Sequence, residues 1–551
     1  MRRGGQIVVD QLVAQGVDLV FGVPGESYIA VLDALLDAPI RYVTCRHEVG
    51  AANMAEAYGK LTGRPGVCMV TRGPGATHAS CGIHTADQDS TPLVLLVGQV
   101  PRAMRGRDAF QELDYPSVFG TMTNWTAEAG SADDLAPAVA HAFRASVAGR
   151  PGPVVLALPE DVLAEESGAA TVVPEEVQRE APGADDLARL RELLAAAERP
   201  LVIVGEGGWS ASASDDVLAF AEASGLPVAA SFRCQDYVDN HAPVYCGPLT
   251  LGGDPKLLQR VRDADLVLAL GGRLGDITTQ GYTLLEAPRP RQALVHVHPD
   301  ADELGSVYQP ALGIASGLPE AAAALRALEP VASRWREWTE AARADYVANL
   351  RHRPLPGDLD MGEVMAELRA ALPEDAVLAS GAGNFTVWAH RFYEFRRYGT
   401  QLAPASGAMG YGLPAAIAAK IVHPERIAVC LAGDGDFLMT GQELVTAVQE
   451  DAPVVVLVVD NRMLGTIRMH QERHFPGRVS GTDLVSPDFA ALARAYGGHG
   501  ERVERTADFA GALERALASG LPSVLHLIVD PEAITPRHTL SEIRAAAQDG
   551  A

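Results

Sequence analysis

The stretch RIAVCLAGDGDFLMTGQELVTAVQEDAPVVVLVVDNRMLG, residues 426–465, decides the fold of this chain. Two apolar runs, 427–431 and 454–459, lie between turn signals, and runs of this length are typical of strands buried on both faces of a parallel sheet. Between the runs, Thr440 and Glu443 have the spacing of a capping box, which predicts the start of a helix there. Connections between neighbouring parallel strands are right-handed, so the stretch predicts a strand–helix–strand unit with its two strands close together.

A polar residue follows each predicted strand. Asp434 lies in the glycine turn 433–435 after the first strand, and Asn461 follows the second. Both should lie at the carboxyl ends of their strands, which is the edge where open α/β sheets bind ligands. A carboxylate, an amide oxygen and loop carbonyls suit Mg²⁺, while the flanking glycines let the amides of Asp436 and Phe437 approach an anion. Because protein-bound Mg²⁺ usually keeps phosphate oxygens as ligands, the implied ligand is a diphosphate.

The spacing of these residues is that of a known motif. Residues 433–435, the 24 residues from 436 to 459 and the closing Asn461 resemble the thiamine diphosphate (ThDP) signature of the superfamily of acetolactate synthase, pyruvate decarboxylase and pyruvate oxidase. Further segments resemble the large catalytic subunit of acetolactate synthase in particular: Arg46-His47-Glu48, 71–77 (TRGPGAT), 108–112 (DAFQE) and 407–416 (GAMGYGLPAA). A glycine turn with a surface aspartate would explain residues 433–435 alone, and it is the combination that favours ThDP.

The resemblance implies which residues bind the cofactor. Mg²⁺ is expected on Asp434, Asn461 and the main-chain carbonyl of Met463. Met409 is expected to be the apolar wedge that folds the two rings of ThDP over each other, and the Gly407 carbonyl to accept from the 4′-amino group. The complete set expected to bind ThDP is Gly383, Asn384, Phe385, Gly407, Met409, Gly433, Asp434, Gly435, Asp436, Phe437, Asn461, Gly465 and Thr466.

Three residues are expected to act on the reacting molecules. Glu48 resembles the family's glutamate that protonates N1′ of the ThDP pyrimidine, and Phe110 and Gln111 resemble a loop that lines the substrate pocket. Each of them also has a plainer interpretation. Glu48 could be a first-turn glutamate favoured by the helix dipole, Met409 could fill the core, and Phe110 and Gln111 could be ordinary loop residues.

Length and alternation predict a three-domain α/β protein. The 551 residues suffice for about three domains of ordinary size, and strand-like segments alternate with helix-like ones, which predicts doubly wound parallel sheets. The resemblance implies that these domains are an N-terminal ThDP-binding (PYR) domain over 1–165, a central Rossmann-like domain over 187–330 and a C-terminal ThDP-binding (PP) domain over 358–551. The segments 60–97 and 420–458 share a pattern, which indicates that the third domain repeats the first and agrees with the resemblance.

Charge and composition narrow the expected partners. The formal net charge of −25 argues against nucleic acid and against an anionic membrane surface. No apolar segment reaches the length that spans a bilayer, and six scattered cysteines without a C-x-x-C pair favour the cytoplasm. The resemblance to ThDP enzymes implies a small 2-oxo acid of the pyruvate type as the partner.

Glu48 and Asp434 lie in different predicted domains, although both must reach one small cofactor. In the family that the chain resembles, the two domains that enclose one cofactor come from two subunits. The resemblance therefore implies a homodimer or homotetramer in which each site is shared across a two-fold interface.

Several positions depart from the acetolactate synthase pattern. Asp460 replaces the first Asn of the motif, His470 stands where a Trp favours a larger acceptor, and Asn124 stands where a Lys follows the Phe-Gln loop. Arg72 and His78 replace a Ser and an Asn. These changes do not touch the ThDP chemistry, but they leave the acceptor and the branched-chain pathway open.

The leading expectation is ThDP- and Mg²⁺-dependent decarboxylation of a 2-oxo acid with ligation of the two-carbon unit to an acceptor. A decarboxylase or acyl-CoA lyase that does not ligate is the alternative among enzymes. A non-catalytic relative is disfavoured, because Glu48, Asp434 and Asn461 are all present. FAD is possible, since residues 272–276 resemble the arginine segment that contacts flavin. The family's Met-His-Gly motif is replaced at 249–253, however, and we expect flavin to be optional at most.

Overall fold

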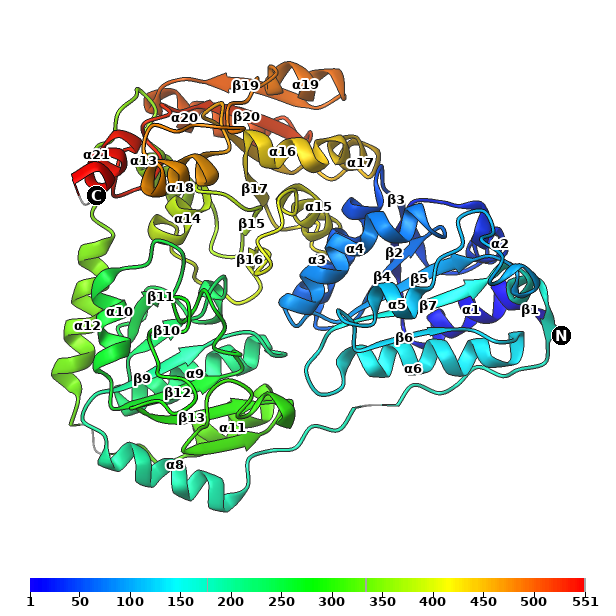
Figure 1. Cartoon of the computed structure of the whole chain (residues 1–551), viewed down its shortest axis with the longest axis horizontal. Coiled ribbons are helices and arrows are strands. Elements are labelled where there is room, and N and C mark those ends of the chain that lie inside the picture. The colour runs from blue at the N-terminus through cyan, green and yellow to red at the C-terminus, as the bar shows by residue number, and fades with distance from the viewer. Residues whose placement is uncertain (176, 332–333, 550–551) are drawn as a thin grey trace. The chain divides into compact units, whose positions relative to one another are not determined.

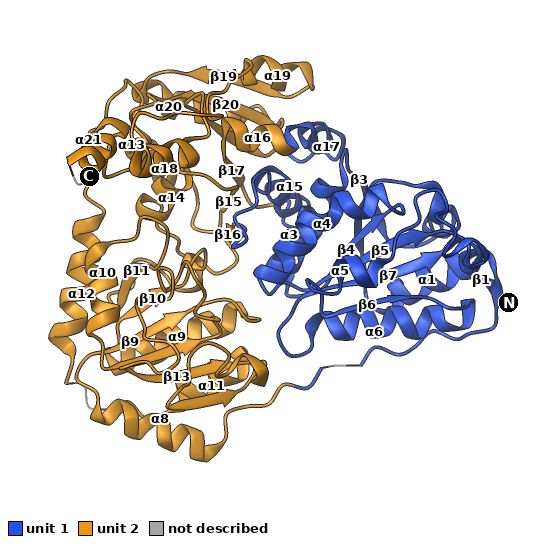
Figure 2. Cartoon of the chain, viewed as in Figure 1, with its two compact units in different colours: residues 1–178, 404–424, 440–452 blue, residues 179–403, 425–439, 453–551 orange. Residues whose placement is uncertain are grey.

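The computed structural model describes residues 1–175, 177–331 and 334–549. By its packing the chain divides into two compact units, which Figure 2 shows in blue and orange. Unit 1 consists of residues 1–178, 404–424 and 440–452, and unit 2 consists of residues 179–403, 425–439 and 453–551. Unit 1 thus combines the N-terminal part of the chain with two short segments from the C-terminal part.

Unit 1 is built on a six-stranded parallel sheet in the order β3-β2-β4-β5-β7-β6 (Figure 1). The strands are β2 (Leu19–Gly22), β3 (Arg41–Thr44), β4 (Gly66–Val70), β5 (Leu93–Gln99), β6 (Trp125–Glu128) and β7 (Pro153–Pro159). Two-residue strands β1 (Arg2–Arg3) and β8 (Glu166–Ser167) pair antiparallel beside it. The three central strands β4, β5 and β7 are buried throughout, as their unbroken apolar runs predict.

Helices cover this sheet on its faces. They are α1 (Gly4–Ala14), α2 (Ile29–Leu35), α3 (Glu48–Thr62), α4 (Pro74–Gln88), α5 (Tyr115–Phe119), α6 (Leu135–Val147) and α7 (Glu160–Ala164). The two C-terminal segments add α15 (Gly412–Val422), which packs on α3, and α17 (Leu444–Gln449). One apolar core joins α1, α2 and α6 to the strands, with Val8, Leu12, Val94 and Leu156 fully buried.

Unit 2 contains two sheets, and the first is Rossmann-like. Its six parallel strands are β9 (Pro200–Val204), β10 (Val228–Ala230), β11 (Tyr245–Pro248), β12 (Leu266–Leu270), β13 (Ala293–His298) and β14 (Leu312–Ala315). They lie in the order β11-β10-β9-β12-β13-β14. Counted within the sheet this order is 3-2-1-4-5-6, the doubly wound arrangement of dinucleotide-binding domains, so the expectation of a Rossmann-like central domain is confirmed.

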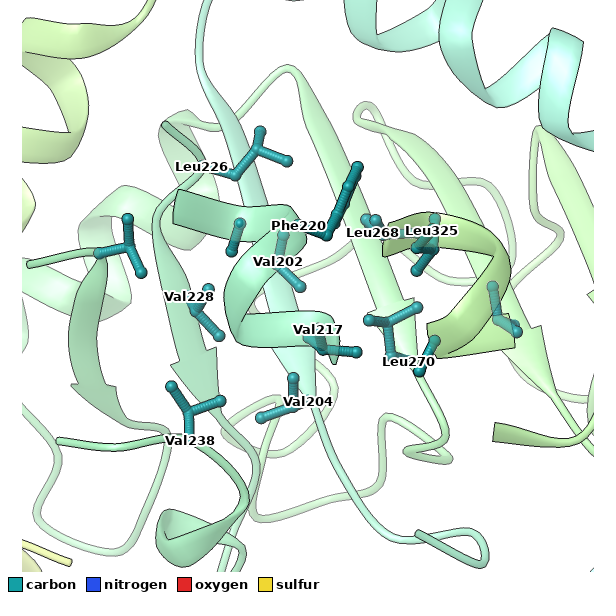
Figure 3. Packing of buried hydrophobic residues seen from close by; sticks show 14 of the residues in the cluster. Val202, Val204, Val217, Phe220, Leu226, Val228, Val238, Leu268, Leu270 and Leu325 are labelled. Carbon is teal, nitrogen blue, oxygen red and sulfur yellow. The ribbon is translucent and has the colours of Figure 1, made fainter. Parts of the chain in front are cut away.

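The faces of this sheet explain its continuous apolar runs. Val202 and Val204 of β9 point into one core with Phe220 of α9 (Ala211–Ser224), as Figure 3 shows. Leu201 and Ile203 point into a second core on the opposite face. Because both faces are buried, every residue of the strand is apolar rather than every other one.

The second sheet of unit 2 carries the stretch that decided the fold. Its strands are β15 (Val377–Ser380), β16 (Gln401–Leu402), β17 (Ala428–Gly433), β18 (Val455–Asp460), β19 (His499–Val503) and β20 (Ser523–Ile528). They are parallel, in the order β16-β15-β17-β18-β20-β19. The predicted strand pair is β17 and β18, which are direct neighbours with Gly433 opposite Val459.

The remaining helices of unit 2 are α8 (Ala184–Ala196), α10 (Pro255–Asp263), α11 (Leu318–Ala327), α12 (Arg336–Asn349), α13 (Met361–Ala371), α14 (Thr386–Phe392), α16 (Asp434–Thr440), α18 (Gly465–His474), α19 (Phe489–Ala495), α20 (Thr506–Ala518) and α21 (Leu540–Asp549).

The repeat indicated by the sequence is visible in the topology. Numbered within each sheet in chain order, the strands of unit 1 and of the second sheet of unit 2 share the order 2-1-3-4-6-5. Strand order reverses between the first and third strands of such a sheet, which are β15 and β17 in unit 2. Ligands bind at this switch point, beyond the carboxyl ends of the strands.

The predicted hydrogen bonds of the capping box are wrong, although the predicted start of a helical segment is present. Helical residues do begin after Thr440, because a 3-10 turn, Gly441–Glu443, runs into α17. A further helix that the sequence did not predict, α16, begins at Asp434 directly after strand β17. The Thr440 hydroxyl donates to the Gly410 carbonyl at 2.7 Å, and its side chain caps no helix. The Glu443 carboxylate accepts from the amides of Arg46 and His47 instead of that of Thr440. Thr440 and Glu443 therefore bond to groups that are distant in the sequence, and neither makes the local bonds of a capping box.

The cysteines behave as apolar side chains. All six are free, and only Cys81 is exposed. Burial raises the pKa of the Cys68 and Cys430 thiols well above the ordinary value, so both stay protonated inside their strands. Among the helices that the structure describes, none combines the length and the apolar character that crossing a bilayer requires.

Candidate functional site

The carboxyl edge of the β15-β17-β18 sheet brings together most of the predicted cofactor residues. Gly383, Asn384 and Phe385 follow β15, and Asp434 is the first residue of α16 after β17. Asn461 follows β18 directly. Since β17 lies between β15 and β18, these three connections lie side by side at the switch point of the sheet.

Two buried carboxylates face each other at this edge. Ser486 Oγ lies 3.2 Å from Asp434 Oδ2 and 2.8 Å from Asp460 Oδ1. Burial raises the pKa of Asp434 to about 6, and the neighbouring Asp460 carboxylate adds to the rise. Burial also acts on Asp460, but bonds from His526, Ser486 and the Arg462 amide outweigh it and lower its pKa.

These groups fit a hard divalent cation. A cation bound to Asp434 would favour its ionised form and offset the repulsion from Asp460. Asn461 and the carbonyl of Met463 could add the further oxygen donors that Mg²⁺ prefers. The loop that carries both is ordered: Asn461 Oδ1 accepts from the Met463 amide at 3.1 Å, and Arg462 adopts a left-handed φ of +57°. Backbone bonds to residues 482–484 hold the loop from its other side.

The glycines of this edge are required by close packing. A Cβ on Gly381 would lie 2.1 Å from Asp436 Oδ1, and this carboxylate accepts from the Ala382 amide at 3.0 Å. A Cβ on Gly383 or Gly433 would lie within 2.7 or 2.8 Å of the Phe385 ring. The Phe385 ring therefore packs against both loops. The cofactor contact predicted for this residue can be made only by its main-chain amide.

Thr466 and Asn384 meet across two loops. Thr466 Oγ1 donates to Asn384 Oδ1 at 2.9 Å, and Asn384 Nδ2 donates to the Ile534 carbonyl at 3.1 Å. A Cβ on Gly465 would lie 2.9 Å from Ile534 Cδ1 and 3.0 Å from Asn461 Nδ2. The structure thus gathers the predicted residues after β15 and β18 into one ordered rim. Phe437 lies on α16 with its ring packed against Phe489 in the core.

Helix α18, which begins at Gly465, is tied to the C-terminal helix α21 by a buried ion cluster. Glu472 is fully buried, and its oxygens lie 2.6 and 2.7 Å from the Arg544 guanidinium and 3.1 Å from Arg468 Nε. These bonds hold the pKa of Glu472 at about 2. The cluster fixes the helix whose first turn carries Gly465 and Thr466.

The low pKa of Glu472 predicts a pH-dependent loss of this tie. Because the folded pKa is depressed from 4.5 to about 2, the stabilisation is complete above pH 4.5 and is lost as the pH falls through this window. Amide exchange of residues 540–549 should accelerate in E472Q relative to the unsubstituted chain above pH 4.5. The difference should shrink towards pH 2, and a difference that grows on acidification would contradict the assignment.

In unit 1 the predicted catalytic glutamate begins a helix. Glu48 is the first residue of α3, and its N-cap His47 accepts from the Val49 amide through Nδ1 at 3.2 Å. His78 Nδ1 lies 2.9 Å from Glu48 Oε2, and a Cβ on Gly75 would lie 3.3 Å from Glu48 Oε1. The side chain is thereby held at the carboxyl edge of the sheet, 13% exposed. The donor atoms of His47, Glu48 and His78 lie within 4.8 Å of one another, so the trio could also hold a metal ion.

The Phe-Gln loop lies at the same edge of unit 1. Phe110 is 74% exposed, and Gln111 has a left-handed φ of +65°. Arg72 Nε donates to Gln111 Oε1 at 3.2 Å, while the same guanidinium pairs with Glu26. A Cβ on Gly73 would lie 2.8 Å from the Gln111 carbonyl, so the glycine turn and the loop fit together. The bond from Arg72 occupies the Gln111 oxygen and leaves its amide nitrogen as the atom that could donate to a ligand.

Gly407 and Met409 lie in unit 1, in the segment before α15. Gly407 has a left-handed φ of +70°, and a Cβ there would meet no atom within 4 Å. The segment is anchored at Ala405, whose amide donates to Asp89 at 2.7 Å, and at Ser406, whose hydroxyl lies 3.0 Å from that of Thr85. Met409 is half-buried.

Two of the departures from the family pattern have structural partners. The Asn124 amide donates to the carbonyls of Ala145 and Arg150 at 3.2 and 3.0 Å, so it ties a loop. His470 is exposed on α18, and its ring stacks on His474 at a centroid distance of 6.2 Å.

The arginine segment of the central sheet is ordered by the protein itself. A Cβ on Gly205 would lie 2.8 Å from Gly272 Cα, so the loops after β9 and β12 touch. His296 Nε2 lies 2.9 Å from the Gly272 carbonyl, and Arg273 lies 3.9 Å from the Glu206 carboxylate. The segment that resembles a flavin contact therefore has partners within the chain.

Sequence reasoning missed residues that act through tertiary contacts. Ser486 and His526 order the paired aspartates from distant segments, and no local pattern marks either of them. The contact of Arg72 with Gln111 was missed as well, although the departure at Arg72 was a usable signal.

Comparison with known proteins gives matches along almost the entire chain. Three family models match: "Thiamine pyrophosphate enzyme, N-terminal TPP binding domain" over residues 2–118, "Thiamine pyrophosphate enzyme, central domain" over 187–328 and "Thiamine pyrophosphate enzyme, C-terminal TPP binding domain" over 381–527. The acetolactate synthase isozyme 2 large subunit of Escherichia coli is 33% identical over 535 residues, which are 96% of this chain and 95% of that protein. The acetolactate synthase large subunit of Parasynechococcus marenigrum is 33% identical, covering 96% of this chain and 87% of that protein. The probable acetolactate synthase large subunit of Methanocaldococcus jannaschii is 31% identical, covering 97% and 93%.

Proposed function

The chain belongs to the thiamine pyrophosphate enzymes and is similar throughout to acetolactate synthase large subunits, and from this premise we propose how its own residues act. The protein is a ThDP-dependent enzyme that decarboxylates pyruvate or a similar 2-oxo acid and joins the two-carbon unit to an acceptor. The observation that carries the proposal is the pair of buried, facing carboxylates Asp434 and Asp460 at the switch point of the β15-β17-β18 sheet, beside Asn461.

In this proposal the rim of unit 2 holds the diphosphate. Asp434, Asn461 and the Met463 carbonyl bind Mg²⁺, and His526 keeps the neighbouring Asp460 ionised as a support. The main-chain amides near Gly383 and Gly465, where close packing excludes side chains, approach the phosphate oxygens. When bound, ThDP supplies the electron sink that decarboxylation of a 2-oxo acid requires.

Residues of unit 1 are proposed to contact the rings of ThDP and the substrate. Glu48 gives a proton to N1′ of the pyrimidine, and His78 keeps its carboxylate oriented. The Gly407 carbonyl would accept from the 4′-amino group of the bound cofactor, and Met409 would pack against its rings. Arg72 fixes the Gln111 oxygen, so the Gln111 amide nitrogen donates to the substrate and Phe110 excludes water beside it.

Assembly and location follow from the same proposal. Glu48 and Asp434 act on one cofactor, and we place them on two chains of a homodimer or homotetramer with equivalent sites. The six free thiols support a cytoplasmic location.

The function is tested by product analysis. The purified protein with ThDP, Mg²⁺ and pyruvate should release CO₂ and form acetolactate, read by proton NMR. A panel of 2-oxo acids as donors and acceptors identifies the preferred pair. Free aldehyde as the only product would show a decarboxylase that does not ligate, and no turnover of any donor would overturn the proposal.

Flavin is expected to be dispensable. The reaction needs no redox step, and Arg273 and Gly272 have partners within the chain. Adding FAD to protein loaded with ThDP and Mg²⁺ should therefore leave the rate of product formation unchanged. Flavin absorption in the purified protein, together with loss of turnover when the flavin is removed, would contradict this expectation.

A further inference from the structure

The carboxylate of Glu443 lies directly behind the start of helix α3. Its Oε1 accepts from the His47 amide at 2.8 Å, and both oxygens accept from the Arg46 amide at 3.1 Å. Thr446 Oγ1 donates to Oε2 at 2.6 Å. Glu443 belongs to unit 1 together with α3, although almost 400 residues separate it from His47 in the sequence.

The fit between this carboxylate and α3 is tight. Glu443 is fully buried, and the three atoms nearest to a Cβ placed on Gly50 all belong to its side chain, the nearest at 2.5 Å. Gly50 lies in the first turn of α3, so a glycine there makes room for a carboxylate from another segment. Burial raises the pKa of Glu443, and the bonds from Thr446 and the two amides oppose that rise.

These contacts precede Glu48 in the chain by one and two residues. We propose that Glu443 is a positioning residue that fixes the backbone from which the Glu48 side chain reaches the cofactor. The inference rests on the proposed role of Glu48 and extends it, because it assigns Glu443 a part in the reaction. His78 holds the carboxylate end of Glu48, and Glu443 holds its main-chain end.

The chemistry supports a strong anchor. Bonds from backbone N–H groups to a carboxylate are charge-assisted, and they are about twice as strong as neutral ones. Without the carboxylate, the amides of Arg46 and His47 lose their acceptor in a partly buried place. A displacement of about 1 Å at a catalytic group can lower a rate by about 10²-fold, so a small backbone shift is enough.

A neighbouring glutamate provides the matched control. Glu450, seven residues further along the same segment, pairs with the Arg41 guanidinium at 2.6 Å. It ties the segment to strand β3, as a merely structural link would, but it does not touch the backbone before Glu48. Truncation of Glu443 and of Glu450 therefore separates positioning from docking of the segment.

The first test needs neither cofactor nor turnover. In cofactor-free protein, amide exchange at Arg46 and His47 should be about tenfold faster in E443A, the effect of about 1.4 kcal/mol for a lost bond, and unchanged in E450A. E443Q keeps one acceptor oxygen and should lie between. Equal protection in E443A and the unsubstituted protein would overturn the proposal.

The second test asks whether Glu443 acts through Glu48. E443A should lower kcat by about 10²-fold with little change in the affinity for ThDP and Mg²⁺, whereas E450A should leave both unchanged. In an E48Q background, E443A should lower kcat by less than about threefold, because the group that it positions is already absent. Additive losses in the double variant would contradict the positioning role.

A second variant keeps the proposal testable if E443A does not fold. In G50A the added methyl group displaces the Glu443 carboxylate without removing it, and the same amides should exchange faster. Unchanged amide exchange in G50A would contradict the proposal. Absence of turnover in the unsubstituted protein would instead refute the proposed function and leave the exchange result standing.

Discussion

Replacing Glu48 with glutamine should lower kcat with pyruvate by about 10²–10⁴-fold, the range for one acid–base group. Glutamine keeps the size of the side chain and can still bond to His78, but it cannot give a proton to N1′. Initial rates with saturating ThDP and Mg²⁺ measure the effect.

The affinity for ThDP separates this role from a structural one. Since the diphosphate is proposed to be held in unit 2, E48Q should bind ThDP and Mg²⁺ within about threefold of the unsubstituted protein, measured by calorimetry. E450Q is the matched control, because Glu450 lies in the same unit and its carboxylate pairs with Arg41. Turnover by E48Q at the unsubstituted rate would remove Glu48 from the mechanism.

The second large effect is expected at Asp434. Removing the carboxylate in D434A should weaken metal-dependent ThDP binding by about 10²-fold or more, because losing even a supporting group of a metal ligand costs about 10–100-fold. Calorimetric titration of ThDP at fixed Mg²⁺ measures the loss. D508A removes an aspartate that pairs with Arg505 on the surface of the same unit, and it should bind normally.

D434A should weaken cofactor binding, but it should not lower the thermal stability of the cofactor-free protein. Burial raises the pKa of Asp434 to about 6, so its ionised form destabilises the cofactor-free fold at neutral pH. Cofactor-free D434A should therefore melt at the same temperature as the unsubstituted protein or higher. A lower melting temperature together with unchanged ThDP affinity would show that Asp434 is structural.

The fold was predictable where the signal is local. The apolar runs 427–431 and 454–459 became β17 and β18, which are parallel neighbours, because strands buried on both faces leave an unbroken apolar pattern. The sequence pattern shared by the first and third parts of the chain corresponds to a shared strand order in their two sheets. The positions of Asp434 and Asn461 followed, since they end neighbouring strands.

The rest depended on contacts that no local pattern encodes. Thr440 and Glu443 have capping-box spacing, yet Glu443 binds the amides before Glu48, and Thr440 binds Gly410. Ser486 reaches the paired aspartates from 26 residues beyond Asp460. The hydrogen-bond partner of a side chain depends on which groups the tertiary fold brings near it. Spacing along the sequence does not predict those partners.

Mixing the two inactive variants tests the central claim most directly. Equal amounts of E48Q and D434A, allowed to exchange subunits, form hybrid dimers in about half of the cases if pairing is random. If Glu48 of one chain and Asp434 of another serve one ThDP, each hybrid has one site with both substitutions and one with neither. Acetolactate formation should then recover to about a quarter of the unsubstituted rate. No recovery, with exchange proved by mass spectrometry of differently labelled chains, would place both residues of a site on one chain and contradict the shared site.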